Sequence, residues 1–339
     1  MKKKNKKKIL LVGSKEFFSL ETMYLRAFKK AQCDVNIFHI YSIGKNLLFR
    51  FFWKYLKIFF FIKQRYDLLK YIKKNKNKYD LIIIYKGLYL TENFLGQLRK
   101  ISHVSRFINI FPDDPLDFRY SRDISNRNLF ESIKNFDYFF TYSKKIKKNL
   151  EIISQNKKII HLPFAHDSFI HKKSKRNFTD VYDLSFIGSA DKDRHDVIKK
   201  LTNYKILIAG NGWGKFSQLK NVSYLGEINA KKSAEVIRKS TISLNIPRKQ
   251  NYYSHNMRTF EIPAMGGLML TKRSSEQNFF FKENKECLMY EDFKDLNNKI
   301  KMALKNKKKL VKIRNNGYKI SKKYTYLSRA KYILKIIYK

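Results

Sequence analysis

The sequence predicts an α/β protein with two Rossmann-like, doubly wound domains. A chain of 339 residues is longer than one hydrophobic core usually organises, which favours two domains of similar size. Short runs rich in Val, Ile, Phe or Tyr alternate with segments of helical length, and this alternation is typical of a parallel sheet covered by helices on both faces. The series of runs ends near residue 162 and begins again near residue 184, so each domain has its own sheet.

The predicted strands fall into two groups. The first group comprises residues 9–12, 35–40, 81–84, 107–110, 138–141 and 159–162. The second group comprises residues 184–187, 206–209, 222–225, 242–244 and 268–270. Between the groups, residues 164–182 are polar and charged without periodicity, which indicates a linker.

A final helix is expected at residues 324–338, because the pattern there is helical and no strand follows it. We expect this helix to cross back to the first domain. The predicted organisation is an N-terminal domain at residues 1–165, a C-terminal domain at 180–322 and a crossover helix at 323–339. The two domains are expected to face each other across a cleft.

The formal net charge of +45 has two explanations. One is a polyanionic partner, such as nucleic acid, anionic lipid or an acidic polysaccharide. The other is composition, because Lys greatly outnumbers Arg and the chain is rich in Ile, Asn, Tyr and Phe, as expected from an AT-rich genome. Only Arg presents the planar fork that recognises bases and phosphates in a bidentate way, so the excess of Lys favours the second explanation.

The cysteines and the N-terminus indicate the compartment. Cys33 and Cys287 each lack a second cysteine nearby, which excludes a Cys-rich zinc site and favours a reducing environment. The apolar run that ends at Gly13 spans five residues, which is too short for the core of a signal peptide. We therefore expect a cytoplasmic protein.

One helical segment, residues 47–62, is strongly apolar and aromatic. Arg50, Lys54 and Lys57 are spaced i, i+4 and i+7 within it and form one cationic stripe. Three charges in so short a run exclude a membrane-spanning helix. Two alternatives remain: a helix lying peripherally on the inner face of the cytoplasmic membrane, with its cations toward anionic lipid, or an ordinary helix that covers a sheet.

The segment SHNMRTFEIPAMGG (residues 254–267) carries the strongest chemical signal. It predicts a short helix whose first turn presents Asn256, Arg258 and Glu261. Free backbone N–H groups and a guanidinium suit a pyrophosphate, and a carboxylate suits ribose hydroxyls, so these groups fit one nucleoside diphosphate. The alternative is that Arg258 and Glu261 form an i, i+3 surface ion pair, which contributes little.

Several short stretches, in order along the chain, resemble one family of enzymes. They are FPDDP (111–115), HLPFAHD (161–167), DLSFIGS (183–189) followed by Arg194, SLN (243–245), NMRTFEIPAMGG (256–267), ECLMY (286–290) and YTYLSR (324–329). These stretches resemble the spore-maturation or CgeB-like glycosyltransferases, which are relatives of the retaining GT-B enzymes with a group-1-type C-terminal domain. The resemblance extends from Ile9 to the C-terminus, is clearest in the second half, and implies a GT-B fold.

The resemblance also implies which residues bind the substrates. Glu261 corresponds to the carboxylate that grips the ribose of a nucleotide-sugar donor, and Arg258 lies near the diphosphate. The implied donor-binding residues are Gly188, Ser189, Arg194, Gly210, Asn245, Asn256, Arg258, Glu261 and Gly266. Gly13 and His166 are expected on the acceptor side. This assignment requires the Glu261 carboxylate to face a cleft.

The sequence departs from the pattern of many retaining relatives at one position. Those relatives carry a second glutamate near the transferred sugar, eight positions before the one that grips the ribose, and Tyr253 occupies that position here. The CgeB-like branch also lacks this glutamate, so its absence does not indicate an inactive protein.

Asp113 and Asp114 precede Pro115 in the first domain. We expect them to be acceptor-side or catalytic carboxylates, together with Arg258 as a catalytic cation; the alternative is that they cap a turn. Two adjacent carboxylates also suit Mg²⁺. GT-B enzymes neutralise the leaving diphosphate with helix N-termini and basic side chains, however, so we expect neither a metal nor another cofactor.

Other catalytic motifs are missing from the sequence. GNGWG (210–214) lacks the GxGxxG spacing of a dinucleotide site and the Lys-Ser/Thr pair of a P-loop, and we interpret it as a flexible cleft loop. There is no HExxH motif and no GxSxG elbow, so a hydrolase has no residues to support it.

The expected function is transfer of a sugar from a nucleoside-diphosphate-sugar to a hydroxyl of a glycan, a lipid-linked intermediate or a protein. The resemblance implies a hexosyltransferase of cell-envelope polysaccharide synthesis that retains the anomeric configuration. The alternative, motivated by the charge of +45, is a protein that binds nucleic acid or another polyanion on the same scaffold without catalysis. No helix-turn-helix, zinc-finger or RNP signature supports that alternative.

Overall fold

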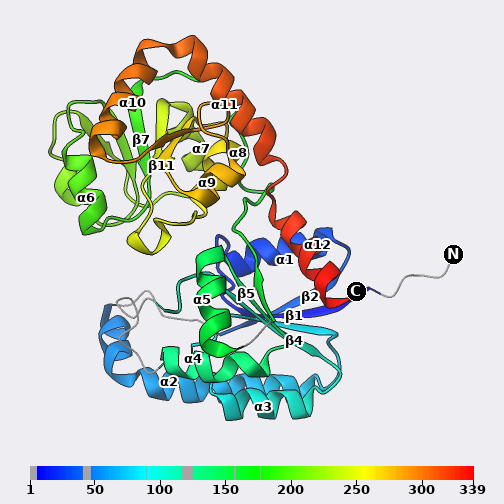
Figure 1. Cartoon of the computed structure of the whole chain (residues 1–339). Helices are drawn as coiled ribbons and strands as arrows, with labels where there is room; N and C mark the ends of the chain where they lie inside the picture. Colours follow the sequence, from blue (N-terminus) through cyan, green and yellow to red (C-terminus); the bar gives the residue numbers. More distant parts are fainter. Residues whose placement is uncertain (1–5, 41–46, 89, 117–124, 156–157, 176) are drawn as a thin grey trace. The chain divides into compact units, whose positions relative to one another are not determined.

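The structure is a computed structural model that describes residues 6–40, 47–88, 90–116, 125–155, 158–175 and 177–339, with residues 47–58, 125–128 and 307 described by their backbone alone. The chain divides into two compact units, of which the first is Met1–Pro163 with Arg329–Lys339 and the second is Phe164–Ser328. Each unit contains a six-stranded parallel sheet with helices on it, so the predicted α/β fold with two doubly wound sheets is confirmed (Figure 1).

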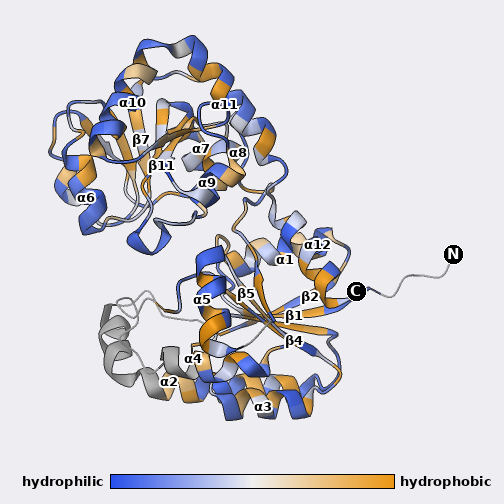
Figure 2. Ribbon diagram, in the orientation of Figure 1, coloured by the Kyte–Doolittle hydropathy of each residue, from blue (hydrophilic) through white to orange (hydrophobic). Residues whose placement is uncertain are grey.

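The sheet of the first unit has the strand order β2-β1-β3-β4-β5-β6, and every neighbouring pair is parallel. The strands are β1 (Lys8–Gly13), β2 (Asp34–His39), β3 (Leu81–Tyr85), β4 (Arg106–Phe111), β5 (Tyr138–Thr141) and β6 (Ile159–His161). All six runs predicted for this domain form strands. The central strands β1, β3 and β4 are almost entirely buried, which explains why they read as nearly continuous apolar runs (Figure 2).

Helices cover both faces of this sheet. They are α1 (Leu20–Lys30), α2 (Leu47–Lys74), α3 (Glu92–Ile101), α4 (Ser125–Ser132), α5 (Lys144–Ser154) and α12 (Tyr326–Ile337). In Figure 1, α1 and α12 lie on one face and α2, α3 and α4 on the other. Side-chain caps define two helix starts, because the hydroxyls of Ser19 and Thr91 accept hydrogen bonds from the N–H groups of Thr22 and Phe94.

The sheet of the second unit has the order β12-β11-β10-β7-β8-β9 and is also parallel. Its strands are β7 (Tyr182–Ile187), β8 (Ile206–Ala209), β9 (Val222–Tyr224), β10 (Ser240–Asn245), β11 (Met269–Lys272) and β12 (Leu288–Tyr290). The five runs predicted here form strands. The edge strand β12 was not predicted.

The helices of the second unit are α6 (Lys192–Lys199), α7 (Ala230–Arg238), α8 (Arg258–Ala264), α9 (Ser275–Phe280), α10 (Phe293–Lys305) and α11 (Lys307–Ser321). One apolar cluster joins both ends of the sheet to the helices on it, and its largest member is the fully buried Trp213. The predicted linker, residues 164–182, is part of this unit.

The chain passes from one unit to the other twice, after Pro163 and after Ser328. On each side of these crossings, a contact within one unit joins the two chain segments. His166 and Thr325 form a parallel bridge in the second unit. In the first unit, Arg329 Nε donates a hydrogen bond to the Pro163 carbonyl over 3.0 Å. From Arg329 onward α12 belongs to the first unit, as the sequence predicted.

Strand order identifies one topological switch point in each sheet. In the first unit the chain moves from β1 to β2 in one direction and from β3 to β6 in the other, so the switch point lies between β1 and β3. In the second unit the corresponding point lies between β7 and β10. Open α/β sheets bind their ligands at the carboxyl ends of the strands beside this point.

The predicted membrane segment, residues 47–62, forms the first half of α2. Its proposed cationic stripe lies outside the described side chains. Of the described ones, Phe59, Ile62 and Tyr66 expose 68%, 50% and 64% of their surface and are spaced to lie on one face of the helix. Among the described residues, no helix is long and apolar enough to cross a membrane.

Candidate functional site

The site in the second unit is organised around the amino end of α8. Asn256 Oδ1 accepts a hydrogen bond from the Thr259 N–H over 3.1 Å, and Asn256 Nδ2 donates to Asn245 Oδ1 over 2.8 Å. Asn245 is the last residue of β10 and is buried. These bonds hold the start of α8 against the end of β10, so both asparagines act in positioning the helix.

Arg258 connects α8 to the other side of the switch point. Its Nε donates to the carbonyl of Ile187, the last residue of β7, over 3.0 Å. Its Nη1 forms a hydrogen bond and an ion pair with Glu261 Oε2. About a third of the side chain, 32%, remains exposed. The guanidinium is thus fixed at the strand ends with part of its surface open to an anion.

Glu261 is buried, with 3% of the residue exposed. Its second oxygen, Oε1, lies 3.5 Å from His171 Nε2. Burial alone would raise the pKa of Glu261, but the charge and hydrogen bond of Arg258, with His171 and His166 nearby, outweigh it and lower this pKa below its ordinary value. The carboxylate is therefore ionised at neutral pH.

The structure differs from the expectations for Arg258 and Glu261 in the burial of the glutamate. The i, i+3 pair of the alternative interpretation is formed, but the glutamate is buried instead of lying on the surface. Glu261 does not face open space either, because Arg258 and His171 cover its oxygens. The contact of Glu261 with His171 is weaker than its contact with Arg258, since 3.5 Å is the outer limit of a hydrogen bond.

His171 is a functional candidate that the sequence did not reveal. Its Nδ1 accepts a hydrogen bond from the Asp167 N–H over 3.0 Å, so a neutral His171 carries its proton on Nε2, the atom that faces Glu261. Asp167 Oδ1 in turn accepts from the Phe169 N–H over 2.8 Å. Because His171 lies in a polar segment without periodicity, only the tertiary fold brings it to α8.

Arg194 joins the two loops at this switch point. Its Nη1 donates to the Ser189 carbonyl over 2.9 Å, and its Nε donates to the Ile246 carbonyl over 3.0 Å. The guanidinium also lies over the ring of Phe186 at 5.5 Å. Arg194 therefore brings positive charge to the strand ends, but backbone carbonyls already use much of its hydrogen-bonding capacity.

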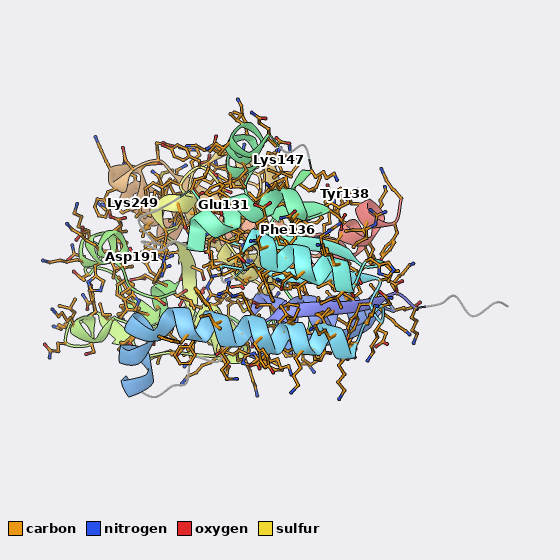
Figure 3. All side chains as sticks on the ribbon, turned by 90° about the horizontal axis from the view of Figure 1, so that it is seen from below. Glu131, Phe136, Tyr138, Lys147, Asp191 and Lys249 are labelled. Atoms are coloured by element: carbon orange, nitrogen blue, oxygen red, sulfur yellow. The ribbon has the colours of Figure 1, made fainter. Side chains whose placement is uncertain are left out.

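Ion pairs add further cations beside these loops. Arg248 Nε lies 3.6 Å from Asp191 Oδ2, and Lys249 Nζ lies 3.3 Å from Asp193 Oδ1. Figure 3 labels Asp191 and Lys249, which lie near each other in that view. Partly exposed pairs of this kind add little to stability. Their effect here is to hold the β10–α8 loop against α6.

Gly188 and Gly210 pack backbone to backbone. Gly210 has a φ of +130°, and a Cβ on it would lie 2.2 Å from the Gly188 carbonyl oxygen, so only glycine fits. The same carbonyl accepts a hydrogen bond from Trp213 Nε1 over 2.7 Å. His195 stacks on the indole with ring centroids 4.9 Å apart. The segment 210–214, expected to be a flexible loop, is thus anchored by a buried ring.

Two predicted site residues have other roles in the structure. Gly266, with a φ of +83°, follows the carboxyl end of α8 and packs on the Lys173 side chain, so it shapes the helix exit and lies away from the amino end. His166, expected on the acceptor side, belongs to the second unit. Its Nδ1 lies 3.2 Å from the Tyr324 carbonyl, and it lies near enough to Glu261 to help lower the pKa of that carboxyl.

In the first unit, the two neighbouring aspartates have separate partners. Asp113 Oδ2 forms an ion pair with Lys86 Nζ at 2.7 Å. Lys86 follows β3 and has a φ of +57°, a conformation that non-glycine residues rarely adopt and that is common at functional sites. Asp114 Oδ1 accepts from the Leu116 N–H over 2.9 Å, as the turn-capping alternative predicted for this pair.

Gly13 ends β1 beside the switch point. A Cβ on Gly13 would lie 2.6 Å from Glu21 Cγ, so the Glu21 side chain lies directly against this glycine. Glu21 is 9% exposed and stands in the first turn of α1. Glu21 could not be singled out from the sequence, because an acidic residue in a first helical turn is common.

A second cluster of buried polar and ionisable side chains lies beside the loop before α8. Ser254 Oγ and His255 Nδ1 both contact Glu276 Oε2, at 2.6 and 2.9 Å. His255 Nε2 accepts from the Phe164 N–H over 3.2 Å. Since that nitrogen is occupied by a backbone amide, the trio cannot act as a nucleophilic triad. It ties the first residue of the second unit to the loop before α8.

Among the described residues, no group of three or more His, Cys, Asp or Glu side chains is placed to hold a metal ion.

Comparisons with known proteins agree with this architecture. Residues 193–335 match the family model described as glycosyl transferase-like. A comparison with curated protein sequences finds no match.

Among solved structures, the chain is similar to Anabaena HepE in complex with UDP and glucose, with a TM-score of 0.68, 12% identity, and 98% of this chain and 99% of that chain covered. It is similar to a sucrose-phosphate synthase from Thermosynechococcus elongatus, with a TM-score of 0.72, 13% identity and 98% of both chains covered. A glycosyltransferase from Rickettsia africae gives a TM-score of 0.64 at 13% identity, with 98% of both chains covered. The chain therefore has the two-sheet GT-B fold of these proteins over nearly its whole length.

Proposed function

We propose that the chain is a glycosyltransferase that takes a sugar from a nucleoside-diphosphate-sugar bound to its second unit. The observation that carries the proposal is the Arg258–Glu261–His171 group at the amino end of α8, at the switch point of a parallel sheet. The match of residues 193–335 to a glycosyl transferase-like family supports it. The similarity to HepE, whose structure contains UDP and glucose, supports a nucleotide-sugar donor.

The chemistry of this group suits a nucleotide. An ionised carboxylate accepts hydrogen bonds and offers none, so Glu261 is matched to the two hydroxyls of a ribose. A ribose hydroxyl would replace the long His171 contact at Oε1, while Arg258 keeps Oε2 in place. The exposed part of the Arg258 guanidinium and the amino end of α8 would then bind the diphosphate and stabilise its charge as it departs.

Further details of the reaction follow from the resemblance to CgeB-like enzymes and stay part of the proposal. They are retention of the anomeric configuration, a metal-independent mechanism, hexosyl transfer, and a hydroxyl acceptor in cell-envelope synthesis. Arg194 would add positive charge near the leaving group. Asp113, held by Lys86, is the better of the two aspartates for an acceptor-side role, because Asp114 is engaged in a turn.

The test is nucleotide binding with a matched control. UDP, GDP and ADP are compared by thermal shift on the intact chain, and one of them should raise Tm by several degrees. Glu261→Ala should abolish that rise. Glu235→Ala, which removes the carboxylate of another i, i+3 pair with an arginine, Arg238, should leave it intact. The absence of a shift with all three nucleotides, together with steeply salt-dependent DNA binding, would favour the polyanion-binding alternative instead.

We also propose that the protein attaches peripherally to the cytoplasmic membrane. The described side chains that support it are Phe59, Ile62 and Tyr66, an exposed apolar stripe on α2 in a strongly cationic chain. Replacing all three with Ser should lower binding to anionic vesicles, because rings and aliphatic chains lose their contact with the acyl region. Unchanged vesicle binding by this variant would contradict the attachment.

A further inference from the structure

His171 belongs to a short turn that fixes its ring. The His171 N–H donates to the Asp167 carbonyl over 2.8 Å, and the Asp167 N–H donates to His171 Nδ1 over 3.0 Å. The Asp167 carboxylate accepts from the Phe169 N–H over 2.8 Å and so closes the turn. Only 4% of the His171 side chain is exposed. The turn therefore sets the orientation of the imidazole independently of Glu261.

The same turn favours a neutral imidazole. A second proton on His171 would lie on Nδ1 and face the Asp167 N–H, so two donors would meet in buried surroundings. Burial also disfavours a charged ring. Glu261 favours the charge, but Arg258 already pairs with that carboxylate and His166 lies near it. We therefore expect a neutral ring whose Nε2–H faces Glu261 Oε1.

A second buried histidine–glutamate pair has the same arrangement with a closer contact. His255 Nε2 accepts from the Phe164 N–H, so the proton of the neutral ring is on Nδ1, which lies 2.9 Å from Glu276 Oε2. His171 Nε2 and Glu261 Oε1 are 3.5 Å apart. Of these two pairs, the one at the strand ends beside the switch point is thus the looser one.

The charge of His171 would decide whether a ribose can reach Glu261. A neutral N–H at 3.5 Å holds Oε1 weakly, and a ribose hydroxyl offers the same oxygen a shorter hydrogen bond. A cation in that place would form a buried ion pair with the carboxylate, and such a pair is costly to break. A neutral ring leaves Oε1 replaceable, whereas a cation would block it.

General electrostatics predicts the opposite effect of a cation at this position. A nucleoside diphosphate is an anion, so added positive charge near its site should increase its affinity. A cation that blocks Glu261 should lower the affinity instead. The two explanations therefore differ in the sign of the effect.

We propose that His171 is a positioning residue for the donor nucleotide. Its neutral imidazole orients Glu261 before the nucleotide binds and gives up Oε1 to a ribose hydroxyl, whereas a cation in its place excludes the ribose. The inference rests on the proposed function, because it describes what keeps the donor site of that reaction accessible.

The test measures the affinity of the intact chain for whichever of UDP, GDP and ADP stabilises it most. His171→Lys should weaken binding at least about ten-fold, because the new ion pair with Glu261 must be broken. His171→Gln, whose amide is a neutral donor, should retain binding to within about three-fold of the wild type. Phe169→Lys is the matched control, because it adds the same charge to the same turn at a residue that is 59% exposed, and it should not weaken binding.

The role of the ribose is tested with the dideoxy form of the same nucleotide, which lacks both ribose hydroxyls. This form does not compete for Oε1, so the wild type and His171→Lys should bind it within about two-fold of each other. NMR of the imidazole nitrogens in the wild type adds a measurement that needs no variant. His171 should be the neutral Nε2–H tautomer from about pH 8 to about pH 6, and its Nε2 resonance should shift when the nucleotide is added.

The outcomes separate this inference from the proposed function. If the nucleotide binds the wild type but His171→Lys binds it within about three-fold as tightly, or more tightly, the inference is wrong and the donor site stands. An imidazolium at His171 near neutral pH, or an equal loss of affinity for the dideoxy form, would also contradict it. A wild type that binds none of the three nucleotides would contradict the proposed function itself.

Discussion

Each unit carries one buried glutamate beside the switch point of its sheet, and the two differ in their partners. Glu261 in the second unit has Arg258 on one oxygen and His171 near the other. Glu21 in the first unit has no hydrogen-bonding or ionic partner among the described residues. Both are about equally hidden from solvent, with 3% and 9% exposed. Burial alone therefore does not determine how a carboxylate is used.

The partners of each carboxylate determine how well it is oriented before a ligand binds. Glu261 is held ionised and oriented before a nucleotide arrives, so little rearrangement is needed when ribose hydroxyls replace the weak His171 contact. Glu21 has no such support among the described residues. The partnered glutamate should therefore contribute to stability.

The largest expected effect comes from removing the partner of Glu261. Arg258→Met leaves a buried carboxylate without its cation, and breaking a buried pair in this way costs about 3 kcal/mol or more. Binding of the stabilising nucleotide should fall as well, because the guanidinium that faces the diphosphate is gone. Urea unfolding and nucleotide titration measure the two effects.

The control for Arg258→Met is Lys147→Met, which breaks a partly exposed i, i+4 pair with Glu151 and should change stability by less than about 1 kcal/mol. Equal effects of the two substitutions would show that the burial of Glu261 has no energetic consequence.

Glycines at the strand ends of the two units should also differ in their effect on stability. Gly210→Ala places a methyl group 2.2 Å from a backbone oxygen at a φ of +130°, and neither can be relieved by a side-chain movement. We expect a loss of about 2–3 kcal/mol. Gly13→Ala meets only the flexible Glu21 side chain, so it should be less destabilising. Gly214→Ala in the same loop as Gly210 meets nothing within 4 Å and is the neutral control.

Tm values for the three variants check this order. A smaller loss for Gly210→Ala than for Gly13→Ala would mean that the contact between the Gly188 and Gly210 backbones is less close than the structure gives.

A smaller effect on the stability of the protein is expected at low pH. The pKa of Glu261 is lower in the folded protein than its ordinary value of 4.5, so the stability from its ion pair is fully present above that pH and is lost as the pH falls through the folded pKa. Glu261→Gln has no such group. The stability difference between wild type and Glu261→Gln should therefore be constant from pH 7 to about 5 and shrink below about 4.5. Unfolding curves across this range measure it, and a difference independent of pH would contradict an ionised Glu261.

Much of the fold was predictable from the sequence, because parallel strands buried on both faces leave contiguous apolar runs between helical segments. The runs at residues 9–12 and 184–187, for example, mark β1 and β7 directly. Strand β12, with three residues at a sheet edge, was not predicted. The last helix was predicted and belongs to the first unit from Arg329 onward.

Only the part of the site whose residues are close together in the sequence could be predicted. Arg258 and Glu261 share one short helix, so their pairing followed from spacing, whereas the burial of Glu261 did not. His171 contacts Glu261 only because the tertiary fold brings the two residues together. Glu21 differs from other glutamates in a first helical turn only because its carboxylate has no partner among the described residues. Neither property is visible in a sequence. The positions of Gly266 and His166 could not be predicted either, because a motif does not say at which end of a helix or in which unit its residues lie.

The most direct test of the account is a crystal structure of the chain with the nucleoside diphosphate that stabilises it most. The account predicts that the ribose hydroxyls lie within hydrogen-bond distance of Glu261, that the His171 contact is replaced, and that the diphosphate lies beside Arg258 at the amino end of α8. A nucleotide bound elsewhere, with Glu261 still covered by Arg258 and His171, would contradict it.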